Sequence, residues 1–444
     1  MHLEGLGMGS NWEVKSLDEI LEINPALKLP KGTEAKKVAM EYVAEFTKKI
    51  QGYENVPFTS GSKFQNDDTL MARITPCLEN GKTAFVDILE QGEIGFGSTE
   101  YFVLRAREGV ADAQFIYYLA TSNEIRTIAI KSMTGTSGRQ RAQKEALLEY
   151  KRPIPSLNEQ RKIGKVLSLF DQKIEKNKEI IKGLELLSKA LFKRWFIAFE
   201  CPNEQGLPYR SSGGEMVESE LGEIPKNFTI SNFDSLISET IGGDWGKESV
   251  QGNYTCDVSI LRGADIPEVK MGNSGKVPKR FILEKNYVKK KLLNNDIVIE
   301  ISGGSPTQST GRVTYINEEI LGRYQDKLLC TNFCRIMRPK LPQAGLFIYM
   351  YFDYFYNEGL FFSYENGTTG IKNFDINSFI QVHPIAMPNI ELIIKFNEVI
   401  EKYYKYIQEL GNENLKLEEM RDSLLPKLLS GEIEIPDESV VESL

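Results

Sequence analysis

The sequence predicts an α+β fold in which one module, rich in strands and carrying an aromatic helix, occurs twice, each copy followed by a long helix. Segment 114–138 aligns without a gap on segment 346–370. After each module, apolar residues recur at helical spacing over several heptads. The 444 residues are 41% hydrophobic and 26% charged, which is typical of a globular protein with two or three domains.

The repeat is clearest where an aromatic helix meets a loop of glycine and threonine. Phe115 and Gly135 of the first copy fall on Phe347 and Gly367 of the second. Each copy therefore predicts a β-rich segment, an aromatic helix, a glycine-threonine loop, a proline-bounded strand and a long helix. Weaker matches flank this window: 67–70 with 295–298, Gly81-Lys82 with Gly311-Arg312, and Pro153 with Pro384.

The two long helices carry start and stop signals. Ser156 and Glu159 have capping-box spacing, which predicts that the first helix starts there. In the second helix, Pro426 is expected to break or kink the chain, and Gly431 to end it. The first apolar seam comprises Ile163, Leu167, Phe170, Ile174, Asn177, Ile181, Leu184, Ser188, Leu191 and Trp195. The second comprises Ile393, Phe396, Ile400, Tyr403, Ile407, Leu410, Asn414, Leu417, Arg421 and Leu424.

These signals divide the chain into six segments. Residues between the first long helix and the second module are rich in Gly, Ser and Pro and read as a linker. The predicted segments are 1–155 (first module), 156–200 (central long helix), 201–226 (linker), 227–388 (second module), 389–430 (C-terminal long helix) and 431–444 (acidic tail).

Cysteine usage and hydropathy favour a reduced, cytoplasmic protein. The five cysteines are scattered, and with only His2 and His383 beside them they do not fit a zinc site, so no metal is expected. The longest apolar run, Leu346–Phe352, is far shorter than the ~20 residues that cross a bilayer. Neither a membrane span nor an export signal is predicted.

Two partial matches to catalytic motifs occur in the sequence, and each fails at a defining position. The tripeptide 81–83 (GKT) resembles the end of a phosphate-binding loop, but Pro76 occupies the leading glycine position. Asp296 and Glu300 approach the spacing of a metal-dependent nuclease, yet Ser302 stands where the lysine should be. These residues alternate like a strand, and no catalytic residue is predicted.

Local positive charge stands out on a chain whose net charge is −8. In the loop after the first aromatic helix, Gly135 and Gly138 permit a close backbone approach, and Arg139 could reach phosphates or guanine edges. The alternatives are a helix-ending turn for this loop and a solvated face for the basic run 289–291. The candidates for such contacts are Thr136, Ser137, Arg139, Arg141, Lys144 and Lys82 in the first module, and Thr368, Thr369, Lys372, Asn373, Arg312, Lys279 and Arg280 in the second.

Three strings carry a resemblance to a known family. The first helix ends in KALFKRWFIAF, the linker reads PYRSSGGEMVESELGEIPKNF, and the second helix ends in MRDSLLPKLLSGEI. In this order they resemble the specificity subunit of type I restriction-modification enzymes, over essentially the whole chain. One departure is Phe228, where the family often has a tryptophan such as Trp12 of the first module.

The resemblance implies two target-recognition domains, each reading one half of a bipartite, asymmetric DNA site, held apart by an antiparallel pair of coiled-coil helices in a pseudo-twofold repeat. It implies partners: double-stranded DNA, two adenine-N6 methylase subunits on the helices and, through them, restriction and translocase subunits. The chain itself is then expected to be non-catalytic and to need no cofactor, while S-adenosylmethionine, ATP and Mg belong to partner subunits. The alternatives are a stand-alone two-domain nuclease and a coiled-coil scaffold without DNA contact.

The antiparallel arrangement also predicts a register for the two seams. Setting Ile163 opposite Leu428 places Asn177 against Asn414 and Trp195 against Phe396. The two asparagines could then satisfy each other and fix the register. The alternative is that each faces solvent where its seam drifts.

Overall fold

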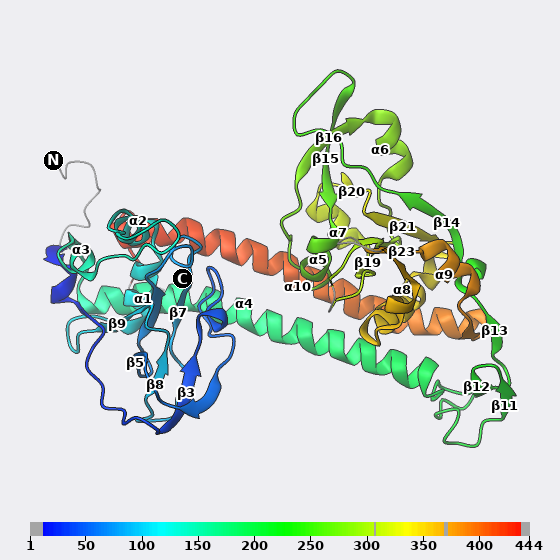
Figure 1. The fold of residues 1–444 in the computed structure, drawn as a ribbon, viewed down its shortest axis with the longest axis horizontal. Helices are drawn as coiled ribbons and strands as arrows, with labels where there is room; N and C mark the ends of the chain where they lie inside the picture. Colours follow the sequence, from blue (N-terminus) through cyan, green and yellow to red (C-terminus); the bar gives the residue numbers. More distant parts are fainter. Residues whose placement is uncertain (1–11, 306–307, 368–371, 437–444) are drawn as a thin grey trace. The chain divides into compact units, whose positions relative to one another are not determined.

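The structure is a computed structural model that describes residues 12–305, 308–367 and 372–436. Its contacts form two compact units. Unit 1 comprises the chain up to Ile174 and from Leu417 onward, and unit 2 comprises Glu175–Lys416. Each unit holds one module of strands and short helices, together with stretches of the long helices α4 (Leu157–Phe192) and α10 (Ile390–Ser430) (Figure 1).

The module of unit 1 is built on a four-stranded antiparallel sheet whose order is β2-β9-β6-β7. Helix α1 packs against it and buries six consecutive residues from Phe115 to Ala120. A second sheet has the order β4-β3-β8-β5, and β1 pairs with β10. The strands are β1 (Glu13–Ser16), β2 (Leu21–Ile23), β3 (Glu34–Val38), β4 (Glu54–Pro57), β5 (Ser62–Phe64), β6 (Thr69–Ala72), β7 (Thr83–Phe85), β8 (Gly95–Gly97), β9 (Tyr101–Ala106) and β10 (Lys151–Ile154). The helices are η1 (Leu17–Glu19), η2 (Met40–Tyr42), α1 (Ala113–Thr121), α2 (Asn123–Lys131) and α3 (Lys144–Leu148).

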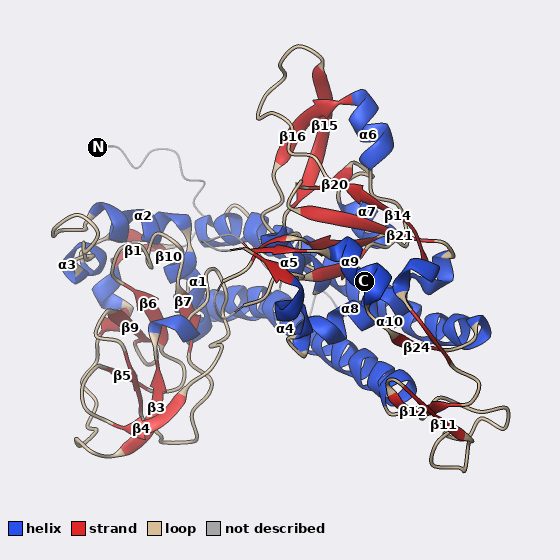
Figure 2. Ribbon diagram, turned by 45° about the vertical axis from the view of Figure 1, so that its right-hand side comes forward, coloured by secondary structure: helices blue, strands red, loops and turns tan. Residues whose placement is uncertain are grey.

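The module of unit 2 is built on the sheet β14-β21-β17-β19, against which α8 packs (Figure 2). A second sheet has the order β16-β15-β20, and β13 pairs with β24. The strands are β11 (Met216–Ser219), β12 (Gly222–Pro225), β13 (Thr229–Ser231), β14 (Ile237–Gly242), β15 (Tyr254–Leu261), β16 (Lys279–Leu283), β17 (Ile297–Glu300), β18 (Ser302–Gly303), β19 (Val313–Tyr315), β20 (Leu328–Cys330), β21 (Cys334–Pro339), β22 (Glu365–Asn366), β23 (Lys372–Phe374) and β24 (Ile385–Met387). The helices are η4 (Phe233–Ser235), η5 (Gly263–Asp265), α5 (Ile266–Lys270), α6 (Glu284–Lys290), α7 (Glu318–Arg323), η6 (Pro342–Ala344), α8 (Gly345–Asn357), η7 (Leu360–Tyr364) and α9 (Ile376–Val382), and the short helix η3 (Lys193–Ile197) continues α4 before the linker.

The two modules repeat one topology. Strands β2, β9, β6 and β7 correspond in order to β14, β21, β17 and β19, and every neighbouring pair is antiparallel in both sheets. In the second sheets, β3 lies between antiparallel β4 and parallel β8, just as β15 lies between antiparallel β16 and parallel β20. The internal duplication predicted from sequence is therefore confirmed.

A buried ion pair occupies the same place in both modules. The Asp68 carboxylate, at the turn before β6, accepts from the Arg105 guanidinium of β9 at 2.6 and 2.7 Å. Asp296, before β17, accepts from Arg338 of β21 at 2.9 Å on both oxygens. Both carboxylate side chains are about 1% exposed, so each needs its guanidinium to offset the loss of hydration.

The long helices begin and end near the predicted residues. Ser156 and Glu159 form the expected capping box, with the Ser156 hydroxyl accepting from the Glu159 N–H and the Glu159 carboxylate accepting from the Ser156 N–H. Helix α10 ends at Ser430, and Gly431 follows with φ of +75°. No helix in the described ranges is long and apolar enough to span a membrane.

Of the two expectations for Pro426, a break is wrong, because α10 continues through this residue to Ser430, and a kink stays a prediction. Proline removes one backbone hydrogen bond from a helix and disfavours the turn before it. Tertiary contacts offset this cost, since Leu428 and Leu429 are buried in the core of unit 1 and the Arg152 guanidinium donates to the Leu429 carbonyl.

Candidate functional site

The glycine-threonine loop of unit 1 lies between α2 and α3 and presents its polar residues to solvent. Gly135 and Gly138 have φ of +124° and +79°, as their predicted role requires. Thr136, Ser137 and Arg139 are exposed at the tip of this loop. The Arg139 side chain has no carboxylate partner among the described residues, so its charge is available to a ligand.

The neighbouring cations of this loop are held differently. The Arg141 guanidinium donates to both oxygens of the Glu100 carboxylate, at 2.7 to 3.0 Å. This hydrogen bonding raises the pKa of Arg141. Lys144, at the start of α3, lies 3.9 Å from the Glu145 carboxylate and is exposed. The structure therefore leaves Arg139 as the less constrained arginine.

Lys82 and Arg312, which occupy matching positions in the repeat, each form hydrogen bonds within their own module. The Lys82 ammonium donates to the Met40 carbonyl at 3.0 Å. Arg312 donates through two nitrogens to the buried Glu300 carboxylate, at 2.5 and 2.8 Å. Contact with a phosphate would compete with these bonds.

The second glycine-threonine loop is described only at its edges. Thr368 and Thr369 lie outside the described residues. Lys372 pairs with the buried Glu365 carboxylate at 2.8 Å, and Asn373 is exposed on the short strand β23.

A half-buried aromatic-cation stack contains Arg280, one of the remaining candidates. Arg280, on β16, lies over the Trp245 ring at 4.2 Å and pairs with Glu248 at 2.9 Å. Lys279 precedes it and is exposed, and Trp245 is 37% exposed. Sequence reasoning missed Trp245, although an aromatic residue inside the glycine-rich loop GGDWG was an available signal. Such stacks are used for nucleic-acid contact.

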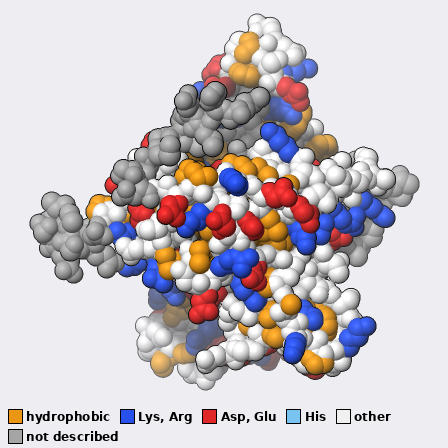
Figure 3. Space-filling view, turned by 90° about the vertical axis from the view of Figure 1, so that its left-hand side faces the viewer, with side chains coloured by type: hydrophobic (Ala, Val, Ile, Leu, Met, Phe, Trp, Pro, Cys, Tyr) orange, Lys and Arg blue, Asp and Glu red, His pale blue; other side chains and the backbone are white. Residues whose placement is uncertain are grey.

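Charges on the face shown in Figure 3, which carries unit 1, are interspersed rather than segregated by sign. This agrees with the net charge of −8. On this face, the visible side chains thus offer local contacts to a polyanion rather than a continuous basic track.

The seam of unit 2 follows the predicted register. The Trp195 and Phe396 rings lie 5.6 Å apart between centroids. The Asn177 amide donates to the Asn414 side-chain oxygen at 2.9 Å and to Glu413 at 2.7 Å. Higher residue numbers on α4 face lower numbers on α10, so the helices run antiparallel here.

Polar residues also interrupt the seam of unit 1. Arg421 of α10 donates to the Asp171 carboxylate of α4 at 2.5 Å, and the Tyr118 hydroxyl donates to its other oxygen at 2.5 Å. The Lys48 ammonium donates to the Tyr118 hydroxyl at 3.0 Å. Burial lowers the pKa of Lys48 to about 8.

Each module covers one face of its own helix pair. In unit 1, a Cβ on Gly164 would meet the Asp112 carboxylate at 2.8 Å. In unit 2, a Cβ on Gly411 would meet the Gly272 carbonyl at 2.2 Å. Gly164 and Gly411 each directly follow an apolar seam residue, Ile163 and Leu410. In an antiparallel helix pair, the positions after the seam residues point to the same side, so each module packs on that side of its helix pair.

The opposite face of each helix pair carries exposed apolar side chains. In unit 1 these are Leu169, which is 55% exposed, and Met420, which is 53% exposed. In unit 2 they include Leu187 (49%) and Tyr406 (45%). Each of the four residues directly precedes a seam residue. In an antiparallel helix pair, these positions point to the side opposite to the one that the module covers. Each unit thus leaves one apolar patch uncovered by its module.

Comparisons with known proteins agree with this architecture. Residues 9–186 match the family model described as type I restriction modification DNA specificity domain. The type I restriction enzyme MjaIX specificity subunit of Methanocaldococcus jannaschii is 24% identical over 339 residues, covering 74% of this chain and 71% of the relative. The HindI specificity subunit of Haemophilus influenzae is 23% identical, covering 86% and 90%. The crystal structure of the type I restriction-modification S subunit from M. genitalium has a TM-score of 0.56 at 16% identity over 98% of both chains, which shows a shared fold.

Proposed function

Because the chain belongs to the family of type I restriction-modification specificity subunits, we propose that each of its two modules reads one half of a bipartite DNA site. The observation that carries this proposal is the duplicated topology. A protein that reads two separate half-sites needs two reading modules, and the repeated sheets and aromatic helices supply them. The long helices then set the spacing between the half-sites.

Catalysis is assigned to partner subunits. The partial catalytic motifs of the sequence fail at defining positions, and the carboxylates of Asp296 and Glu300, which approach a nuclease motif, are each held by an arginine of the same module. In this proposal adenine methylation, ATP-driven translocation and cleavage occur on the methylase and restriction subunits, which bind S-adenosylmethionine, ATP and Mg.

The proposed contact surfaces each present an exposed cation, Arg139 in unit 1 and Lys279 in unit 2, and the Arg280 guanidinium next to Lys279 is paired with Glu248. In unit 1 the proposal uses the glycine-threonine loop with Arg139, and in unit 2 it uses the Trp245–Arg280 stack with Lys279. Both combine a cation with a donor or a ring that can approach a phosphate or a base.

Binding of the chain to a DNA duplex, alone and with its methylase, tests this function. Affinity is expected to rise when the methylase is added, because a chain of net charge −8 supplies few phosphate contacts by itself. DNA cleavage or methyl transfer by the pure chain would contradict the assignment of catalysis to partners. Salt-insensitive or absent DNA binding by the reconstituted complex would favour a scaffold.

The methylase subunits are proposed to bind the uncovered helix faces. One matched patch per unit, with Leu169 and Met420 in unit 1 and Leu187 and Tyr406 in unit 2, fits two copies of one partner. Gly183, one turn before Leu187, has open space where its Cβ would be, which permits close approach of a partner helix.

Charge introduced into either patch tests this docking. Leu187→Glu and Met420→Glu are each expected to reduce the complex from two methylase subunits per chain to one, measured by native mass spectrometry. Leu207→Glu, at a 54% exposed leucine of the linker, is the matched control and should retain two. Two methylases on either patch variant would contradict the docking site.

A further inference from the structure

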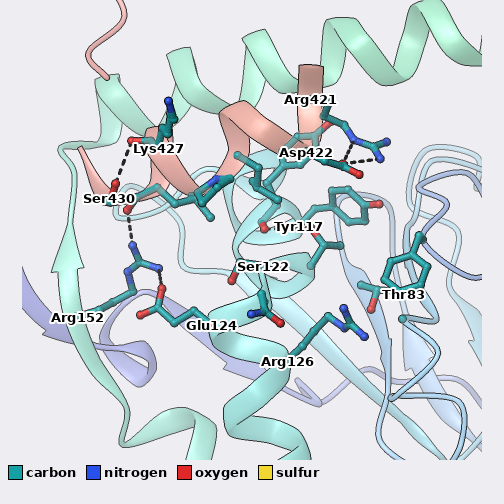
Figure 4. A pocket seen from close by; sticks show the side chains of 18 of the residues that line it. Thr83, Tyr117, Ser122, Glu124, Arg126, Arg152, Arg421, Asp422, Lys427 and Ser430 are labelled. Atoms are coloured by element: carbon teal, nitrogen blue, oxygen red, sulfur yellow. Dashed lines mark hydrogen bonds and ion pairs between the residues drawn. The ribbon is translucent and has the colours of Figure 1, made fainter. Parts of the chain in front are cut away.

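A large cavity lies entirely within unit 1, between α2 and the end of α10. Its volume is about 910 Å³, at the upper end of the range of small-molecule sites. Four aromatic residues are among those that line it, namely Trp12, Phe46, Tyr117 and Tyr118. Phe46 is exposed, whereas the two tyrosines are buried. Thr83, Tyr117, Ser122 and Arg126 border the same space in Figure 4.

The second module shows that the fold does not require this cavity. In the repeat, Ser122, the N-cap residue of α2, matches Tyr354 of α8. Leu425 of α10 matches Phe192 of α4, because the two residues lie equally far from the starts of their helices. In unit 2 the rings of Phe192 and Tyr354 pack together, with centroids 6.1 Å apart. Unit 1 therefore has room where unit 2 has two aromatic rings.

One cation that faces the cavity is not neutralised by a carboxylate. The other basic side chains in its wall are paired: Arg152 with Glu124 at 2.6 Å, Arg421 with Asp171 at 2.5 Å, and Lys427 with Glu432 at 3.6 Å. Among the described residues, Arg126 has no carboxylate partner. Its terminal nitrogen donates to the Glu79 carbonyl at 2.8 Å, and its group lies 4.8 Å from the centre of the Phe46 ring.

Two buried polar atoms at this place also lack partners. The Nε of Arg126 and the Oγ1 of Thr83 are buried and make no hydrogen bond within the part of the chain that the structure describes. Thr83 is 1% exposed. A buried donor without a partner destabilises the protein unless a ligand satisfies it.

We infer that this cavity binds a nucleotide, with the base against the Trp12 and Phe46 side chains and the phosphate on the guanidinium of Arg126. The ring-lined volume suits a planar base, and the unpaired guanidinium suits a phosphate oxygen. The nucleotide is either a free mononucleotide or an unstacked nucleotide of bound nucleic acid. Only the second source rests on the function proposed above.

Calorimetric titration of the full-length chain with AMP tests the first source. AMP is expected to bind, and Arg126→Gln to weaken it about 10- to 150-fold, the range of a charge-assisted hydrogen bond. Leu425→Phe, which copies the second module, is expected to abolish binding while the chain stays folded by circular dichroism. Arg107→Gln, at an exposed arginine outside the cavity, is the matched control and should bind like wild type.

A DNA duplex with one extrahelical adenosine nucleotide tests the second source. If AMP does not bind, this duplex is expected to bind the chain and its methylase more tightly than an intact duplex, and Arg126→Gln should remove that gain. The inference fails if neither ligand shows an effect that depends on Arg126, or if adenosine or ribose 5-phosphate binds as tightly as AMP. Binding of the intact duplex is unaffected by such a failure, so the proposed DNA recognition is tested separately.

Discussion

Some of the candidate cations are paired with a carboxylate and others are not, and this difference decides which of them can bind a ligand. Arg141 and Arg312 lie in bidentate contact with Glu100 and Glu300. Arg139, two residues from Arg141, is exposed at a loop tip and has no such partner in the described part of the chain. An arginine already held by a carboxylate must give up that bond before it can bind a phosphate or a base, so Arg139 is the better ligand.

Arg139→Ala is therefore expected to weaken DNA binding of the complex. The loss should be about 1–3 kcal/mol if Arg139 reads a base, and the slope of affinity against salt should flatten if it holds a phosphate. Fluorescence anisotropy over a salt series measures both, with Arg107→Ala as the control at an exposed, ion-paired arginine. Unchanged affinity and salt slope, even in the double variant Arg139→Ala/Arg141→Ala, would make the loop a structural turn.

Lys48 makes a second prediction at this scale. Burial lowers its pKa to about 8 in the folded protein, although Asp171 and Asp87 oppose the shift. The unfolded chain, with an ordinary lysine pKa near 10.5, then binds more protons than the folded chain between about pH 8 and pH 10.5. Folding stability should therefore rise with pH across this window.

Comparison with Lys48→Met isolates this contribution. The free energy of unfolding of wild type, relative to the variant, should increase by on the order of 2 kcal/mol from pH 7.5 to pH 10. Denaturant unfolding at several pH values measures it, because other titrating groups are common to both proteins. A difference that does not change with pH would show that Lys48 is not perturbed.

Among the elements, the long helices combine apolar seams with a few polar layers. In unit 2, Asn177 and Asn414 are buried. One amide atom of each, Asn177 Oδ1 and Asn414 Nδ2, has no hydrogen-bond partner among the residues that are described. This layer is therefore less stable than an apolar one, but it favours a register in which the two amides meet.

Leucine substitutions separate stability from register. Asn177→Leu alone should destabilise the chain by about 1–3 kcal/mol, since it leaves Asn414 buried without its partner. The double variant Asn177→Leu/Asn414→Leu should be at least as stable as wild type. It should also broaden the spin-label distance distribution between positions 182 and 405, which lie on α4 and α10 of unit 2. A distribution as narrow as in wild type would show that the asparagines do not set the register.

For the whole molecule, the duplication was predictable from the sequence and the ion pairs were not. The repeat survives in local patterns, such as Asp68 and Asp296, whose preceding residues both adopt positive φ. The partner of a surface cation is decided by tertiary contact, as for Arg141 with Glu100. Sequence reasoning also had no signal for the cavity of unit 1, because a hollow appears only when the packed neighbours of Ser122 and Leu425 are known. The domain boundaries proposed from sequence stay predictions.

Maps of N6-methyladenine in the DNA of cells that express the methylase test the central claim most directly. With the intact chain, methylation is expected at one bipartite, asymmetric sequence, and without the chain this pattern should be absent. With residues 1–150 exchanged for those of a relative, one half of the sequence should change while the other half stays the same. A methylation pattern that does not depend on the chain, or an exchange that alters both halves together, would contradict the account.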